Sequence, residues 1–269
     1  MLDYYPEFSP MSRAGRQFGE VAEAQAIKHC QLCVYSSDWA AETAVANYGA
    51  DREKILVAPF GANVSKLPDR SSFERSLAQR STKKFRVLLV GVNWQRKGGD
   101  LAAQAVAQLR REGIDISLSV VGAPPSDAAL VTDVISYEGW IDKNDPSGDA
   151  TLGRLLAQSH VLLLPTRAEC FGVVFAEAAA FGVPSVATKT GGVTTAVQDG
   201  KTGLLMDMDA GAEQYAAALR RLLTDRAAYE TYARAAYDDY QKRLSWSVNG
   251  AVLRERMCAL IRGDRNQAA

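Results

Sequence analysis

Short apolar runs alternate with amphipathic segments along most of this chain. From residue 85 onward the runs recur regularly, and polar or glycine-containing loops bound each of them. We interpret them as buried strands at Phe85–Val90, Ile116–Val121, Val134–Tyr137, Val161–Leu164, Ser185–Ala187 and Gly203–Met206. Strands of this kind that alternate with helices predict βαβ units and a parallel sheet covered on both faces. The expected fold class is therefore α/β, with a Rossmann-like sheet.

Helical patterns fill the segments between these strands. They cover about 100–111, a short stretch near Ala128, about 150–157, the segment that opens at Gly172, and almost everything after Gly211. Before residue 85 we expect an amphipathic helix up to about 29, strands at 32–35 and 54–58, and a helix between those strands that ends at Gly49. The polar stretch that ends at Lys84 is predicted to be a connection.

Charge and composition narrow the classes of partner. The 269 residues contain 31 Lys and Arg and 31 Asp and Glu, so the net charge of zero argues against nucleic acid. No apolar run approaches the roughly 18 residues of a transmembrane helix. The first residues have neither a basic nor an apolar region, so we expect no signal peptide and a cytoplasmic location. A peripheral contact with a membrane stays compatible with this composition.

Two carboxylates near the end of a predicted strand carry the most specific signal. Glu169 lies in the loop after Val161–Leu164, and Glu177 lies about one turn into the helix that opens at Gly172. The start of a helix presents unpaired N–H groups that suit a phosphate, and carboxylates accept hydrogen bonds from sugar hydroxyls. This combination suits a nucleotide-diphosphate sugar. The alternative is that both glutamates are surface residues.

Two further loops follow predicted strands, where ligands bind in open parallel sheets. Gly91 is followed by Arg96 and Lys97, two cations that would neutralise a diphosphate. The alternative is a solvated surface pair. Trp140 follows the strand near 134–137, and it either lines a pocket for a base or belongs to the core.

Several other classes of site find no support. No Gly-x-Gly-x-x-Gly follows a strand, and no Walker-type phosphate loop, serine elbow or His-Glu-x-x-His pattern occurs. Cys30 and Cys33 have C-x-x-C spacing without a second pair, so we interpret them as small buried residues and expect no metal site. The alternative is a redox pair.

These segments together resemble the signature of retaining glycosyltransferases of family 4, in the GT-B superfamily. The resemblance rests on Pro-Thr-x-x-Glu169-x-Phe-Gly-x-x-x-x-Glu177-Ala, on Gly91 followed by Arg96-Lys97-Gly, and on the segments 55–63 and 199–205. It extends from about residue 34 to 223. It implies transfer of a sugar from a nucleotide-diphosphate-sugar donor to an unknown acceptor (a glycan, a lipid or a small molecule), with retention at the anomeric carbon, in a setting such as polysaccharide biosynthesis.

The resemblance also implies roles for individual residues. Glu169, Lys97 and Arg96 would be catalytic: the carboxylate near the reacting carbon of the sugar, the two cations on the diphosphate. Glu177 would bind the ribose hydroxyls. The remaining donor-binding residues would be Gly91, Trp140, Phe171, Gly172, Val173 and Val174. Neither a metal nor a cofactor is implied, because Arg96 and Lys97 would neutralise the diphosphate in place of a metal ion.

The chain departs from the family pattern in two positions and in its first part. Val92 stands where an arginine is usual, and Thr195 where a glutamate is common. We divide the chain into a remnant of the N-terminal, acceptor-binding lobe (1–60), a connection (61–84), the nucleotide-sugar-binding domain (85–225) and C-terminal helices (226–269). Because most of the first lobe is missing, two alternatives stand beside the transferase: a non-catalytic nucleotide-sugar-binding fragment and half of a two-chain enzyme. A nucleotide-sugar epimerase is a third alternative.

Overall fold

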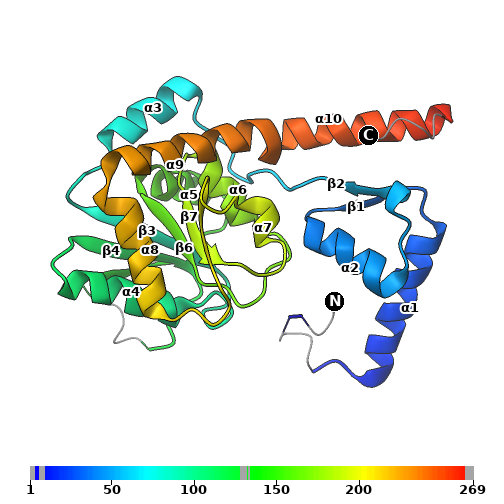
Figure 1. Ribbon diagram of the computed structural model, residues 1–269, viewed down its shortest axis with the longest axis horizontal. Coiled ribbons are helices and arrows are strands. Elements are labelled where there is room, and N and C mark those ends of the chain that lie inside the picture. The colour runs from blue at the N-terminus through cyan, green and yellow to red at the C-terminus, as the bar shows by residue number, and fades with distance from the viewer. Residues whose placement is uncertain (1–3, 6–9, 128–131, 133, 264–269) are drawn as a thin grey trace.

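Six parallel strands form the main sheet, in the order β5-β4-β3-β6-β7-β8 (Figure 1). The computed structural model describes residues 4–5, 10–127, 132 and 134–263. The strands are β3 (Phe85–Gly91), β4 (Ile116–Gly122), β5 (Ile135–Gly139), β6 (Val161–Leu164), β7 (Ser185–Thr188) and β8 (Gly203–Met206). All six predicted strands are therefore present, with only their ends displaced.

The central strands are apolar along their whole length because both faces of the sheet are covered. All four residues of β6 are buried, as are all four of β7. Helices α4 (Gly99–Arg111) and α8 (Ala212–Thr224) pack together on one face, while α5 (Pro146–Gln158) and α6 (Val173–Ala180) cover the other (Figure 1). The predicted α/β class with a doubly covered parallel sheet is confirmed.

A smaller α/β unit precedes the main sheet. It contains the parallel strands β1 (Cys33–Tyr35) and β2 (Ile55–Val57), the helices α1 (Arg13–His29) and α2 (Asp38–Tyr48), and a 3-10 turn at Arg52–Lys54. The Ser37 side chain caps α2, and Gly49 ends this helix with a φ of 65°. These elements agree with the predicted order.

The segment 61–84 contains a helix that the sequence pattern did not predict, α3 (Arg70–Gln79). Asp69 caps it by accepting a hydrogen bond of 2.7 Å from the N–H of Ser72. Only Phe73 and Leu77, four residues apart, are buried in this otherwise polar helix. Phe73 stacks on Tyr237 with ring centroids 4.3 Å apart. Two apolar positions are too few to distinguish an amphipathic helix from a polar connection in the sequence. Whether the segment forms a helix therefore depends on the residues against which it packs.

Three helical segments follow α8, namely α9 (Arg226–Asp239), a π-helical turn (Tyr240–Leu244) and α10 (Trp246–Arg262). In Figure 1, α10 runs out from the main sheet and passes over β1 and β2. The guanidinium of Arg256 donates a 2.6 Å hydrogen bond to the carbonyl of Glu53, so the last helix connects the two units. No helix in the described part of the chain has the length and apolar character needed to span a membrane. The predicted short helix near Ala128 lies outside the described residues.

Candidate active site

The loops at the carboxyl ends of β3, β4 and β6 meet at one edge of the sheet. Gly91 and Gly122 are paired at the ends of β3 and β4. Beside them lies a hollow of about 460 Å³, bordered also by Asn63, Trp140 and Lys143. A Cβ atom at Gly91 would overlap the Lys97 side chain, so the glycine allows that lysine to lie across the strand end.

Lys97 and Glu169 form a buried ion pair. The Lys97 ammonium donates a hydrogen bond to the Glu169 carboxylate, and the two residues are 8% and 7% exposed. The guanidinium of Arg96 lies 3.9 Å from the same carboxylate oxygen and donates to the carbonyl of Ala168 at 3.2 Å. Lys97 and Glu169 are 72 positions apart in the sequence. The surface alternatives for the Arg96-Lys97 pair and for Glu169 are therefore wrong.

Local sequence shapes the loop that carries the two cations. The side chain of Asn93 accepts from the N–H of Arg96 at 2.9 Å, and the N–H of Arg167 donates to the carbonyl of Arg96 at 2.7 Å. Gly98 has a φ of 71°, and a Cβ atom there would overlap the carbonyl of Pro165. The loop can approach the end of β6 only because this position is glycine.

Glu177 is the second buried carboxylate, 1% exposed on α6. The ammonium of Lys143 lies 2.7 Å from its Oε1 atom, and the N–H of Asn63 donates to the same oxygen at 3.3 Å. Lys143 is a site residue that sequence reasoning missed. Its position three residues after Trp140, at the end of a strand, was the available signal. The surface alternative for Glu177 is also wrong.

The helix that begins beside Glu169 has the expected open start. Gly172 is the residue before α6, with a φ of 79°, and no side chain caps the helix. The N–H groups of Val173 and Val174 are in the first turn, where intrahelical partners are lacking. Phe171 is 2% exposed and packs edge-on against Phe60, so the phenyl ring belongs to the core and only its main chain borders the loop.

Trp140 is 69% exposed and borders the hollow beside Gly91. The alternative that Trp140 is a core residue is therefore wrong.

The two positions that depart from the family pattern have different surroundings. Val92 is exposed, whereas Thr195 is buried and its hydroxyl both accepts from the N–H of Asp38 at 3.0 Å and donates to the Asp38 carboxylate at 2.8 Å. Thr195 and the helix α7 (Val193–Ala196) that contains it thus attach the start of α2 to the main sheet.

Two tyrosines near the start of the chain also belong to this edge. The hydroxyl of Tyr4 accepts from the N–H of Glu169 at 2.9 Å, and that of Tyr5 accepts from the N–H of Cys170 at 2.7 Å. Burial, followed by the contacts with Cys170 and Glu169, raises the pKa of Tyr5 above its ordinary value. Sequence reasoning missed both residues, because no pattern in the chain associates them with a loop 165 positions away.

Cys170 lies in the loop after β6, whereas the other cysteines and both histidines lie away from this edge. Among the residues that the structure describes, no group of three His, Cys, Asp or Glu side chains could hold a metal ion. Cys30 is exposed at the end of α1, contrary to the prediction of a buried residue, while Cys33 is half-buried at the start of β1. His160 is buried at the opposite edge of the sheet, and its Nδ1 atom accepts from the N–H of Arg86 at 3.0 Å.

The fold and the site define an α/β protein with a doubly covered parallel sheet and two cation–carboxylate pairs at the carboxyl ends of its strands. Residues 84–225 match the family model described as Glycosyl transferases group 1, and the chain belongs to this family. It is 32% identical over 225 residues to a D-inositol 3-phosphate glycosyltransferase of Arthrobacter sp. (strain FB24), and the match covers 81% of this chain and 53% of the relative. A protein of the same description from Nocardia farcinica is 31% identical, covering 77% and 48%. The chain thus spans about half the length of these relatives.

Solved structures share the fold at lower sequence identity. Sucrose-phosphate synthase from Thermosynechococcus elongatus superposes with a TM-score of 0.73 at 22% identity, covering 96% of this chain and 65% of that one. Anabaena HepE in complex with UDP and glucose gives a TM-score of 0.71 at 20% identity, covering 95% and 69%. These similarities support the GT-B architecture.

Proposed function

We propose that this chain binds a nucleotide-diphosphate sugar and takes part in transfer of the sugar to an acceptor, with retention at the anomeric carbon as in family 4. The observation that carries the proposal is the Lys97–Glu169 pair beside the start of α6. The pair and its neighbours offer the Lys97 and Arg96 cations for a diphosphate, the N–H groups at the start of α6 for its oxygens and the Glu169 carboxylate for the sugar. The names of the relatives, and the UDP and glucose bound to HepE, support it.

The charges of the site residues suggest a separate role for each of them. Lys97 and Arg96 stabilise the negative charge that develops on the leaving diphosphate, and the N–H groups of Gly172, Val173 and Val174 add to this effect. Glu169 contacts the sugar near its reacting carbon, and Glu177 accepts hydrogen bonds from the ribose. We propose residues 85–225 as the donor-binding domain. The base, the sugar and the acceptor stay open.

Calorimetric titration with UDP, GDP and ADP tests donor binding. The wild-type chain should bind one of them, and Lys97→Met should weaken that binding about tenfold or more, since a hydrogen bond to a charged group contributes about 1.5–3 kcal/mol. Lys84→Met is the matched control, because this exposed lysine precedes β3 at the opposite edge of the sheet. If Lys97→Met binds as tightly as wild type, the diphosphate is not held here.

A binding fragment without catalysis, alone or as half of a two-chain enzyme, is the second candidate. The half-length match to the relatives favours it. Incubation of the chain with the sugar form of the selected nucleotide separates the two proposals. Release of the nucleoside diphosphate together with free sugar, with water as the acceptor, would support catalysis if Glu169→Gln abolished it. Tight binding without release would support the fragment. Conversion of the donor to an epimer with no released nucleotide would instead support the epimerase.

A further inference from the structure

Two consecutive N–H groups in the loop that carries Glu169 are bound by side chains from the other end of the chain. The N–H of Glu169 donates to the Tyr4 hydroxyl at 2.9 Å, and the N–H of Cys170 donates to the Tyr5 hydroxyl at 2.7 Å. Residues 165–171 belong to no helix or strand. Their main-chain groups therefore need partners from elsewhere, since buried N–H groups are costly to leave unpaired.

Tyr4 also binds the neighbouring loop. Its hydroxyl shares a 3.0 Å hydrogen bond with Thr190, in the loop after β7. Gly191 has a φ of 48°, and a Cβ atom there would overlap both the Tyr4 hydroxyl and the carbonyl of Glu169. The Tyr4 hydroxyl thus lies between the loops that follow β6 and β7. It fits there because residue 191 is a glycine and has no side chain.

The aromatic rings of Tyr4 and Tyr5 also contact the small unit and one cation of the site. The Tyr4 ring packs on Trp39 of α2 with centroids 4.4 Å apart. The Arg96 guanidinium lies 5.2 Å from the centre of the Tyr5 ring, a cation–π arrangement. The pair therefore contacts the small unit on one side and, on the other, the loops of both Glu169 and Arg96.

We propose that Tyr4 and Tyr5 form a latch that positions Glu169 for the donor sugar. Neither tyrosine is assigned a contact with substrate: each holds the main chain from which the Glu169 carboxylate extends toward Lys97. Because Tyr4 rests on α2, a shift of the small unit relative to the main sheet is transmitted to that carboxylate. The positioning role rests on the proposed function, whereas the latch itself does not.

The latch can be tested without any ligand. Amide hydrogen exchange measured by NMR should show protected N–H groups at Glu169 and Cys170 in the wild-type chain. Tyr4→Phe should accelerate exchange at Glu169, and Tyr5→Phe at Cys170, each about tenfold or more. Tyr48→Phe is the matched control, because its hydroxyl donates to Glu20 within the small unit at 2.7 Å. Unchanged exchange at 169 and 170 in both tyrosine variants would overturn the latch.

The positioning role needs a second readout, the gain in affinity that the sugar adds. This gain is the ratio of the dissociation constants of a nucleoside diphosphate and its sugar form, for UDP and UDP-glucose or the corresponding GDP and ADP pairs. Tyr4→Phe should reduce it about two- to tenfold, the effect of one hydrogen bond, and leave the affinity for the diphosphate within twofold.

The two readouts separate the possible failures. Faster exchange with an unchanged sugar gain would overturn the positioning role. Equal weakening of diphosphate and sugar-nucleotide binding would overturn it as well, because a general structural defect has that effect. If the wild-type chain binds no nucleotide, the proposed function fails, and the exchange data still decide whether the latch exists.

Discussion

Each buried carboxylate of the candidate site meets a cation from a different loop. Lys97 balances Glu169, and Lys143 balances Glu177. Removing one member of a buried ion pair costs about 3–5 kcal/mol, because the remaining charge is left without a partner. At the scale of single residues, the buried Lys97–Glu169 pair is therefore the most sensitive position of the site, whereas solvent screens the pair of Glu177 with the exposed Lys143. Substitutions there test both stability and binding.

Lys143→Met should weaken binding of the selected nucleoside diphosphate about tenfold, because Glu177 loses the cation that holds it beneath the hollow. The 2′,3′-dideoxy form of the same nucleotide should bind the variant and the wild-type chain within twofold of each other, since Glu177 is proposed to act on the ribose hydroxyls. Calorimetry measures both. Lys66→Met, at an exposed lysine nearby, is the control. Equal losses for the two nucleotides would show that Lys143 does not act through the ribose.

His160 makes stability depend on pH. Burial is the main reason that the pKa of His160 falls from 6.5 to about 4. Below pH 6.5 the unfolded chain therefore binds a proton that the folded chain does not bind until about pH 4. Stability should fall across this window by up to about 3 kcal/mol, at roughly 1.4 kcal/mol per unit.

Urea unfolding at pH 7, 6 and 5 measures this effect. His160→Gln should flatten the dependence, because the titrating group is gone. His29→Gln is the control, since it removes the same side chain from an exposed position at the end of α1. A slope in His160→Gln equal to that of the wild-type chain would contradict the assignment.

At the scale of elements, the site depends on how closely the loop after β3 approaches the end of β6. Gly98 combines a φ of 71° with a main-chain neighbour, the carbonyl of Pro165. Gly113, in the turn after α4, has a φ of 86°, and a Cβ atom there would meet nothing within 4 Å. The two glycines thus share the unusual backbone conformation and differ only in the close approach.

Gly98→Ala should therefore cost more than Gly113→Ala. The second variant should lose about 1 kcal/mol from backbone strain alone. The first should lose a further 1–3 kcal/mol, as is typical of overpacking, and its nucleotide affinity should drop with it because Arg96 and Lys97 are displaced. Thermal unfolding and calorimetry report the two effects. Similar losses in both variants would mean that the approach to Pro165 is not tight.

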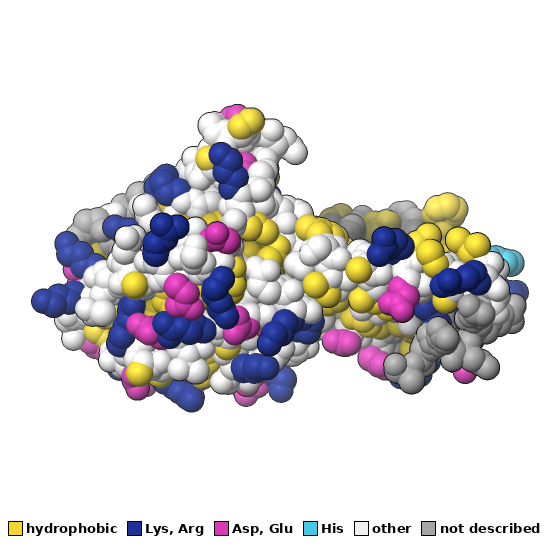
Figure 2. Space-filling model, turned by 90° about the horizontal axis from the view of Figure 1, so that it is seen from above, with side chains coloured by type: hydrophobic (Ala, Val, Ile, Leu, Met, Phe, Trp, Pro, Cys, Tyr) yellow, Lys and Arg dark blue, Asp and Glu magenta, His cyan; other side chains and the backbone are white. Residues whose placement is uncertain are grey.

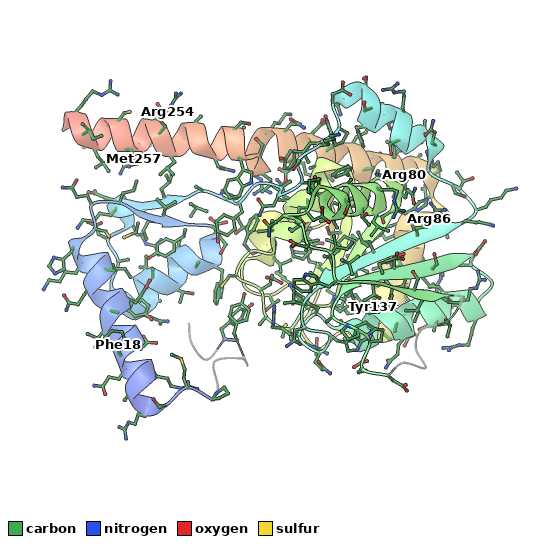
Figure 3. The ribbon with its side chains drawn as sticks, turned by 180° about the vertical axis from the view of Figure 1, so that it is seen from behind. Phe18, Arg80, Arg86, Tyr137, Arg254 and Met257 are labelled. Atoms are coloured by element: carbon green, nitrogen blue, oxygen red, sulfur yellow. The ribbon has the colours of Figure 1, made fainter. Side chains whose placement is uncertain are left out.

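At the scale of the whole molecule, the small unit and the last helix leave several large apolar side chains in solvent. Phe18 on α1 is 77% exposed and Ile261 on α10 is 83% exposed, and Val21 and Met257 are at least half exposed on the same helices. Figure 2 shows apolar side chains gathered on the smaller part of the molecule. Figure 3 labels Phe18 and Met257 on the two helices that flank it. Large apolar side chains that are exposed in this way promote association.

Phe18→Asp combined with Ile261→Asp should therefore raise the concentration at which the chain stays monodisperse. Light scattering coupled to size-exclusion chromatography measures this. Gln104→Asp combined with Gln79→Asp, which adds the same two charges at exposed polar positions of α4 and α3, is the control for charge alone. An equal gain from the control would show that net charge, and not the apolar side chains, sets the solubility.

The sequence by itself determined the main sheet and the central part of the site. Strands such as β6 are recognisable because burial on both faces makes every residue apolar. Arg96, Lys97, Glu169 and Glu177 were predicted because polar residues at the ends of such strands fall at the ligand-binding edge of a parallel sheet. These signals are local, so they can be recognised in a single sequence.

Tertiary structure alone decided the partners of these residues. Tyr4 and Tyr5 contact the site from 165 positions away, and nothing in their neighbouring residues indicates it. Lys143 follows a strand, but its pairing with Glu177, 34 positions away, is decided by packing. Packing also decides the helix α3, because its two buried apolar residues form a core only together with residues of α9. Local patterns fix which face of an element is buried, whereas the choice of partner depends on how the elements pack, and packing joins residues that the sequence keeps far apart.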